Sequence, residues 1–354
     1  MRWDIFCQVI DNYGDAGVCW RLCRALSHGN DSGIRLFCDD LKVLDAIAHG
    51  NAVKAGQALG IDVQPWNQAE DVNDCADVVI EAFACNLPDA YIQTMVNRQQ
   101  TGRPAIWMNL EYLTAESFAD AMHLMPSPQN NGLTKYFFFP GFTDKTGGVL
   151  LGDWDEVTSR PVPDSLVQSM QLCTPGALKV LVFQYPTSSI VPWLAQLNDA
   201  LTDVHRQADI FITPNQNIPE STSFSHLKLI RLPFIPQEDF DWLLAHCDLN
   251  LVRGEDSFVR AQWAAKPLIW DIYPQSDQVH EIKHAAFMEH YLKGVPAQFR
   301  QSATALMTRK PASEWLNDLA PLTVHAENWE HKLRNLDGLE VKIVNFVKSQ
   351  EKSR

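Results

Sequence analysis

The sequence lacks the long apolar runs and the excess of basic charge that would mark several common classes of protein. No apolar run approaches the ~20 residues that a membrane-spanning helix needs. Lys and Arg number 29 against 43 Asp and Glu, a formal net charge of −14. This balance argues against binding to the nucleic-acid backbone, because such binding needs a basic surface. The opening residues, MRWDIFCQVI, also lack the charged-then-apolar layout of a secretory signal. We therefore expect a cytoplasmic protein without membrane or nucleic-acid partners.

The eight cysteines form no C-x-x-C pair. Cys19 and Cys23 are one helical turn apart, a spacing compatible with metal binding, but no cluster of His or Cys completes a site. We expect buried, reduced thiols and no metal.

What is present is the composition of a folded α/β protein. The chain has 354 residues, of which 46% are hydrophobic and 20% charged, enough for two ordinary domains. In the first part, segments of strand character alternate with helical ones, which predicts a parallel sheet covered on both faces. The expected strands are residues 3–10, 34–38, 76–80 and 105–108, and the expected helices are residues 18–28, 41–49 and 89–99.

Residues 125–175 break this rhythm, because prolines and glycines are frequent there. That composition predicts long connecting loops and a domain boundary. The alternation then resumes and predicts a second parallel sheet, followed by a mostly helical C-terminal third. The expected strands are 178–183, 209–213, 228–232, 249–252 and 267–271, and the expected helices are 189–200, 237–246, 257–265 and 339–349.

The loop DNYGDAG (residues 11–17) follows the first expected strand, at the sheet edge where ligands bind. Asp11 and Asp15 could converge on one pocket, or one could orient the other. The alternative is structural, with Asp15 capping the helix and Asp11 starting a turn, and the pattern alone does not separate the two interpretations. The remaining candidate positions of this loop are Asn12, Tyr13, Gly14 and Gly17.

The loop RGEDS (residues 253–257) joins an expected strand to an expected helix. A helix start suits a diphosphate, with Arg253 adding a permanent charge and Ser257 a hydroxyl. Asp256 is expected to act as the N-cap. Glu255 is a poor phosphate ligand and is better placed to hydrogen-bond a sugar or ribose hydroxyl.

Four aromatic residues of the second half could stack on a planar base, although each taken alone fits a core position equally well. They are Phe183, Tyr185, Phe234 and Phe240. Gln237 lies among them in the sequence and could read a base edge with its amide.

The sequence resembles the EarP family, protein-arginine rhamnosyltransferases that modify translation elongation factor P. The resemblance spans nearly the whole chain, and RGEDSFVRAQ followed by KPLIW is its most specific part. In QYP (residues 184–186) the chain departs from the family pattern, which has Gly before the Tyr and Arg after it. Further matching segments are DNYGDAGVCWRL, IEAFACNLP, NLEYLTAE, HLMPSPQ, KYFFFPGF, LPFIPQEDFD and IYPQ.

The resemblance implies a GT-B architecture of two Rossmann-like domains facing a central cleft. We expect an acceptor-binding domain over residues 1–165, a nucleotide-sugar-binding domain over 175–335, and a C-terminal helix, about 336–354, that packs back on the first domain. It also implies dTDP-β-L-rhamnose as donor, elongation factor P as acceptor, no metal, and inversion at the anomeric carbon. By the motif match, the critical acidic residues are Asp11, Asp15 and Glu255. The donor-binding positions are Phe183, Tyr185, Phe234, Gln237, Phe240, Arg253, Asp256 and Ser257.

An arginine acceptor explains why carboxylates are needed. The guanidinium is protonated at neutral pH and has no lone pair, so a carboxylate must bind it and take its proton. We assign Asp15 as that base and Asp11 as the group that orients either the acceptor or Asp15. The alternatives are a glycosyltransferase of the same fold acting on a lipid or small molecule, and a non-catalytic nucleotide-sugar-binding protein.

Overall fold

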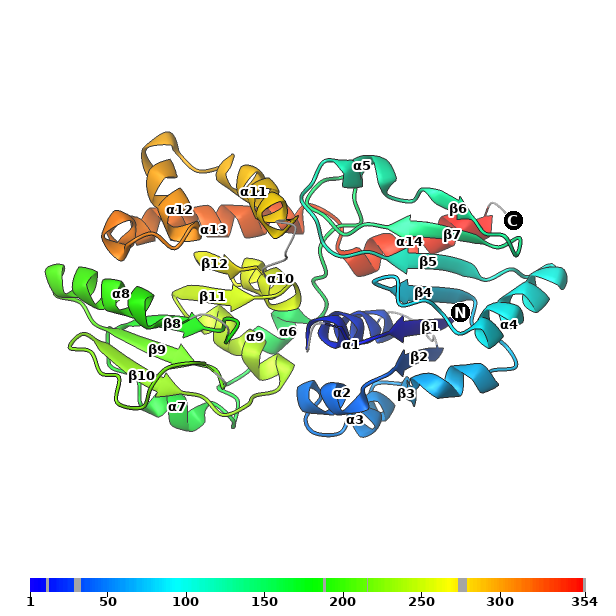
Figure 1. Cartoon of the computed structure of the whole chain (residues 1–354), viewed down its shortest axis with the longest axis horizontal. Coiled ribbons are helices and arrows are strands. Elements are labelled where there is room, and N and C mark those ends of the chain that lie inside the picture. Colours follow the sequence, from blue (N-terminus) through cyan, green and yellow to red (C-terminus); the bar gives the residue numbers. More distant parts are fainter. Residues whose placement is uncertain (11–12, 29–32, 187–188, 215, 273–278, 353–354) are drawn as a thin grey trace. The chain divides into compact units, whose positions relative to one another are not determined.

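The computed structural model describes residues 1–10, 13–28, 33–186, 189–214, 216–272 and 279–352. The chain divides into two compact α/β units. The first comprises residues 1–153 together with 333–354, and the second comprises residues 154–332. Figure 1 shows a twisted sheet with helices on both of its faces in each unit.

In the described part of the first unit the sheet has seven strands in the order β3-β2-β1-β4-β5-β7-β6. All pair in parallel except β6, which is antiparallel to β7. The strands are β1 (Arg2–Cys7), β2 (Gly33–Cys38), β3 (Ile61–Pro65), β4 (Val78–Ala82), β5 (Ile106–Leu110), β6 (Pro126–Pro128) and β7 (Thr134–Phe138). The helices are α1 (Gly14–Ser27), α2 (Leu41–Ile47), α3 (Ala52–Ala58), the 3₁₀ turn η1 (Trp66–Asp71), α4 (Asp89–Gln100), α5 (Phe118–Met122) and α14 (Leu339–Lys352).

The second unit has a five-stranded parallel sheet in the order β10-β9-β8-β11-β12 over its described residues. The strands are β8 (Leu178–Val182), β9 (Ala208–Ile212), β10 (Leu227–Arg231), β11 (Leu249–Arg253) and β12 (Leu268–Asp271). The helices are α6 (Trp154–Thr158), α7 (Val167–Gln171), α8 (Val191–Asp203), α9 (Gln237–His246), α10 (Asp256–Trp263), α11 (Val279–Leu292), α12 (Arg300–Met307) and α13 (Leu319–Arg334), with 3₁₀ turns η2 (Ala297–Phe299), η3 (Ala312–Glu314) and η4 (Leu316–Asp318).

The helix α14 packs on the first unit, against elements that are distant from it in sequence. Leu339, Ile343, Phe346 and Val347 recur at helical spacing and are buried in the same apolar cluster as β1 and α1. Burial of four large side chains stabilises this contact by roughly 6–12 kcal/mol in transfer terms. The end of the chain is therefore part of the core of the unit in which the chain begins.

The expectation that residues 125–175 are connecting loop is wrong in part. Residues 134–138 form β7, a parallel strand whose register continues from β5. The prolines at 126 and 128 lie on β6, the edge strand, where a missing N–H interrupts no inner ladder. Prolines and glycines here bound short elements and do not abolish them. The strand β3 and the helix α3 were also not expected.

The expected domain boundary at residue 165 is too late, because the first unit ends at residue 153. The ring of Trp154 lies 4.8 Å from the guanidinium carbon of Arg260 on α10. The indole N–H of Trp242 on α9 donates to the carbonyl of Arg160, 2.9 Å away. These contacts bind α6 and the residues after it to the second unit.

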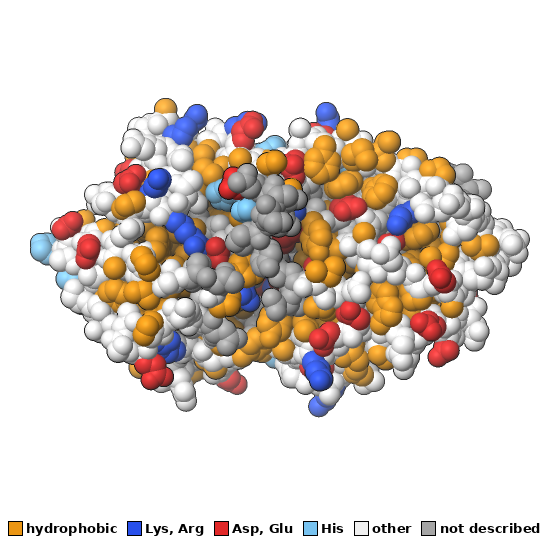
Figure 2. Space-filling view, in the orientation of Figure 1, with side chains coloured by type: hydrophobic (Ala, Val, Ile, Leu, Met, Phe, Trp, Pro, Cys, Tyr) orange, Lys and Arg blue, Asp and Glu red, His pale blue; other side chains and the backbone are white. Residues whose placement is uncertain are grey.

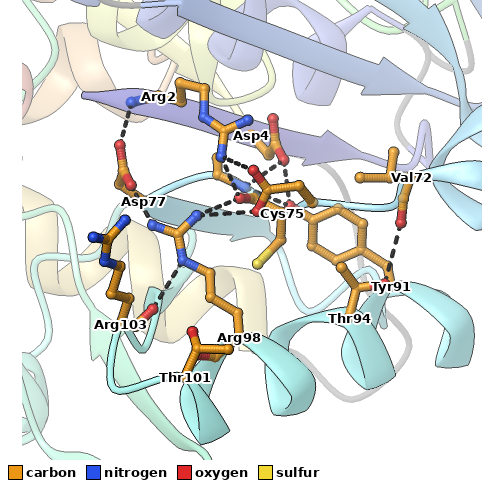
Figure 3. Close-up of polar contacts among 12 residues, drawn as sticks. Arg2, Asp4, Val72, Cys75, Asp77, Tyr91, Thr94, Arg98, Thr101 and Arg103 are labelled. Atoms are coloured by element: carbon orange, nitrogen blue, oxygen red, sulfur yellow. Dashed lines mark hydrogen bonds and ion pairs between the residues drawn. The ribbon is translucent and has the colours of Figure 1, made fainter.

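A polar network lies at the end of the first sheet where β1 begins (Figure 3). Asp4 accepts two hydrogen bonds from Arg35, at 2.7 and 2.6 Å, and one from the hydroxyl of Tyr91. Arg98 pairs with Asp77 and donates to the carbonyl of Cys75. The network satisfies charges that would otherwise be costly to bury. It lies at the opposite end of β1 from the candidate loop.

The cysteines are free thiols, and all but Cys173 are buried, as expected. Large apolar side chains are exposed on and just after α5, where Figure 2 shows hydrophobic atoms at the surface. They are Phe118, Met122 and Met125.

Candidate active site

The first candidate loop leads from β1 into α1, which begins at Gly14, earlier than expected. Tyr13 is the N-cap residue, and its carbonyl accepts from the amide of Gly17 at 2.8 Å. Asp15 therefore lies inside the first helical turn, where the helix dipole favours a negative charge. Asp11 and Asn12 lie outside the described residues.

The carboxylate of Asp15 is held from two directions. The backbone amide of Ile10 donates to Oδ2 at 2.8 Å, and the hydroxyl of Tyr112 donates to Oδ1 at 3.1 Å. Asp15 is only 2% exposed. It is therefore not the cap of α1, since Tyr13 occupies the N-cap position.

Tyr112 is a site residue that the sequence reasoning did not single out. It follows β5, so it lies at the carboxyl edge of the same sheet as Asp15. Its ring stacks on Phe83 with centroids 4.3 Å apart and planes 11° apart. Phe83 follows β4 and has a φ of 56°, a strained conformation for a side chain of this size. The expected strand ended at residue 108, so Tyr112 did not stand out as a residue at a strand end.

In the second unit, Arg253 ends β11 and lies among the expected base-binding aromatics. Its guanidinium carbon is 4.6 Å from the ring centroid of Phe183 and 4.9 Å from that of Tyr185. The ring of Phe240, on α9, meets Phe183 edge to face at 5.2 Å. The segment after β8, the helix α9 and the end of β11 thus bring a cation and three aromatic rings together. Phe234 is 48% exposed on the segment that leads from β10 into α9.

The turn after β11 fixes the start of α10. Gly254 adopts a φ of +64°, a conformation that suits glycine. Glu255, and not Asp256, is the N-cap residue, so the expectation for Asp256 is wrong. Asp256 is the first helical residue, and its Oδ2 accepts from the side-chain amide of Gln237 at 3.0 Å. Ser257 follows, half-buried in the first turn.

The contact with Asp256 orients the amide of Gln237. Because its nitrogen donates to a carboxylate, its oxygen Oε1 is left as an acceptor. Gln237 is buried, and Oε1 has no hydrogen-bond partner within the described ranges. A buried acceptor without a partner costs free energy unless a ligand N–H completes it.

At QYP (residues 184–186) the chain has side chains that differ from the family pattern, but backbone hydrogen bonds hold this segment in place. The carbonyl of Gln184 accepts from Arg253 at 3.4 Å and from Gln216 at 3.0 Å. The amide of Tyr185 donates to Asp271 at 2.9 Å, and Asp271 also pairs with Arg309 at 2.9 Å. Tyr185 is therefore held by the end of β12.

A fully buried ion pair anchors α10 to α9. Arg260 donates to Oδ2 of Asp241 through Nε at 3.2 Å and Nη2 at 2.9 Å, and neither side chain is exposed. The pair fixes α9, which begins at Gln237, against α10, which begins at Asp256.

Lys283 on α11 is a second residue that the sequence reasoning missed. Its ammonium lies 3.3 Å from Oε1 of Glu255. No pattern in the sequence connects the two positions, because α11 belongs to a stretch predicted only as helical.

The described residues contain neither a candidate metal site nor a candidate membrane-spanning helix. In those ranges no three or more His, Cys, Asp and Glu side chains are grouped so that they could hold a metal ion. No helix within them has both the length and the apolarity needed to cross a membrane.

The two parallel α/β units have the architecture of GT-B glycosyltransferases, and solved structures of such enzymes are similar to this chain. A spinosyn rhamnosyltransferase, SpnG, solved with thymidine diphosphate, is similar in fold with a TM-score of 0.55 at 13% identity, over 98% of this chain and 100% of its own. A structure described as the basis for EarP-mediated arginine glycosylation of translation elongation factor EF-P has a TM-score of 0.64 at 26% identity, over 98% and 99%.

Residues 3–348 match the family model EarP, elongation-factor P (EF-P) rhamnosyltransferase. The protein-arginine rhamnosyltransferase of Pseudomonas putida is 42% identical over 83% of this chain and 82% of its own. The enzyme of that name from Shewanella oneidensis is 37% identical over 98% of both chains. The chain belongs to the EarP family, and it is an enzyme, a rhamnosyltransferase. The interpretation as a non-catalytic binding protein therefore does not hold.

Proposed function

We propose that this enzyme transfers L-rhamnose from dTDP-β-L-rhamnose to an arginine side chain of translation elongation factor P, with inversion at the anomeric carbon. The observation that carries the proposal is the family match, which includes both candidate loops. Because the proposed acceptor is a translation factor, we place the reaction in the cytoplasm.

In this proposal Asp15 receives the acceptor. A protonated guanidinium is a poor nucleophile until a proton leaves, and a carboxylate can both hold the charge and accept the proton. The hydrogen bonds from Ile10 and Tyr112 fix the direction of the carboxylate that is to receive the guanidinium. We assign Asp15 as the general base, and Asp11 as the residue that orients the base or the acceptor.

The second unit supplies the donor site. The rings of Phe183, Tyr185 and Phe240 offer faces and edges against which a base can stack. The unpartnered Oε1 of Gln237 matches the N3–H of thymine, and cytosine lacks that donor. We propose that Gln237 reads the base and that Phe234 extends the apolar wall.

The leaving diphosphate needs stabilisation as the bond to C1 breaks. Arg253 supplies a permanent charge, and the start of α10 at Asp256 and Ser257 supplies backbone N–H groups and the positive end of the helix dipole. Glu255 is assigned to the sugar or to the nucleoside hydroxyls. We propose that these groups meet the charge without a metal ion. Transfer should then persist at an unchanged rate in a chelator such as EDTA.

Titration calorimetry with dTDP-rhamnose and with UDP-sugars tests the donor. The proposal requires the thymidine donor to bind more tightly, and equal binding of both sets would overturn it. Replacing Gln237 with Ala should weaken dTDP binding by about tenfold, the loss expected for one buried hydrogen bond of about 1–1.5 kcal/mol. A loss of binding to dTDP and to inorganic diphosphate alike would assign Gln237 a structural role instead.

A further inference from the structure

The carboxylate of Glu255 lies where a negatively charged donor is proposed to bind. Glu255 is the N-cap residue of α10, but its side chain makes no capping hydrogen bond. Its Oε1 lies 3.3 Å from the ammonium of Lys283 instead. The two side chains are 25% and 22% exposed, so water screens this contact only in part.

Lys283 is brought to this position by the packing of α11. Phe287, one turn further along the same face of the helix, is buried with its ring edge-on to Phe258 at 4.6 Å and to Trp270 at 6.0 Å. Phe258 and Trp270 in turn stack face to face at 3.9 Å. The aromatic cluster thus fixes α11 against α10 and β12, and the ammonium of Lys283 is held at the start of α10.

The charges around this turn require such a cation. A nucleoside diphosphate at the start of α10 would meet the carboxylates of Glu255 and Asp256. Asp256 already accepts a hydrogen bond from Gln237. Glu255 is half-buried, so without a counter-charge it would repel the phosphates and its orientation would be lost.

We propose that Lys283 is a positioning residue that compensates the charge of Glu255 and directs its carboxylate, so that the start of α10 accepts a nucleoside diphosphate. The inference rests on the proposed donor site. Its distinctive feature is that Lys283 acts through Glu255, and not by independent attraction of the phosphates.

A double-mutant cycle on the full-length enzyme tests this, with dTDP binding measured by calorimetry and rhamnosyl transfer measured as KM and kcat. Lys283→Met should weaken dTDP binding by about tenfold and raise the KM for the donor, because Glu255 then loses the positive charge that lies 3.3 Å from it. In a Glu255→Gln background the same change should have less than a threefold effect. Lys283→Arg should restore most of the affinity.

Lys293→Met is the matched control. Lys293 lies directly after the last residue of the same helix and pairs with Glu289 at 3.3 Å, but both side chains are well exposed. This variant should bind dTDP like the wild type. If Lys283→Met also binds like the wild type, or loses as much affinity in the Glu255→Gln background as alone, the inference fails. If the wild-type enzyme itself does not bind dTDP, the proposed donor is wrong, and the inference fails with it.

Discussion

At the scale of single residues, the first unit holds the carboxylate of Asp15 with hydrogen bonds to both of its oxygens. Asp15 is buried, yet each of its oxygens has a protein donor, and one of these donors is a side chain stacked on Phe83. Hydrogen bonds to a carboxylate restrict its rotation. A base that must meet a guanidinium at a fixed distance benefits from that restriction.

Tyr112→Phe tests the contribution of the side-chain donor. The change removes the hydrogen bond to Asp15 and keeps the ring on Phe83, so kcat should fall by about tenfold while dTDP affinity stays the same. Tyr136→Phe is the matched control, because the hydroxyl of Tyr136 donates to Gln350, on α14, at 3.3 Å. A wild-type kcat in Tyr112→Phe would show that the backbone contact alone positions Asp15.

At the scale of elements, the donor half-site depends on helices that are locked by buried polar contacts. Gln237 begins α9 and Asp256 begins α10, and the pair Asp241–Arg260 fixes one helix against the other. Breaking a buried pair leaves an uncompensated charge in the core, which costs far more than losing a surface pair.

Asp241→Asn should therefore lower the unfolding free energy of the second unit by about 3–5 kcal/mol in urea titrations. Glu238→Gln on the same helix provides the comparison, because its partner Arg160 is half-exposed at the surface and the pair should contribute less than about 1 kcal/mol. Equal effects of the two changes would mean that Asp241 is solvated in the folded protein.

A half-buried histidine makes the first unit sensitive to acid. Burial lowers the pKa of His123 from 6.5 to about 4, with a smaller effect of nearby Lys342. Its Nδ1 accepts from the amide of Phe139 at 3.1 Å, which requires the neutral ring.

The unfolded chain binds a proton at His123 at a higher pH than the folded one does. This contribution to stability is therefore complete above about pH 6.5 and is lost as the pH falls toward 4. His123→Gln should reduce the slope of unfolding free energy against pH in that window. An unchanged slope would mean that His123 keeps an ordinary pKa in the fold.

At the scale of the whole molecule, the alternation of strands and helices predicted the class of each unit, because buried parallel strands are continuous apolar runs. It failed where that signal is weak. The strand β7 is short and lies among prolines and glycines, and β3 (IDVQP) carries a polar residue between apolar ones. The packing of α14 on the first unit was expected only from the family resemblance, since an amphipathic helix does not specify its partner.

The candidate site was predictable where a motif lies at the end of a strand. The loop that carries Asp15 and the turn that carries Arg253 and Glu255 are such places. Tyr112 and Lys283 could not be assigned in the same way, because their roles depend on contacts between elements that are distant in sequence. Asp256 was misassigned as a cap because helix boundaries shift by a residue without changing the pattern.

The most direct measurement is the intact mass of elongation factor P after incubation with this enzyme and dTDP-rhamnose. The proposed reaction predicts a gain of one deoxyhexose on the wild-type acceptor, none when the target arginine is replaced by lysine, and a rate at least about 100-fold lower with Asp15→Asn. An unmodified acceptor in the presence of a bound donor would contradict the proposed acceptor. A full rate with Asp15→Asn would contradict the assignment of the base.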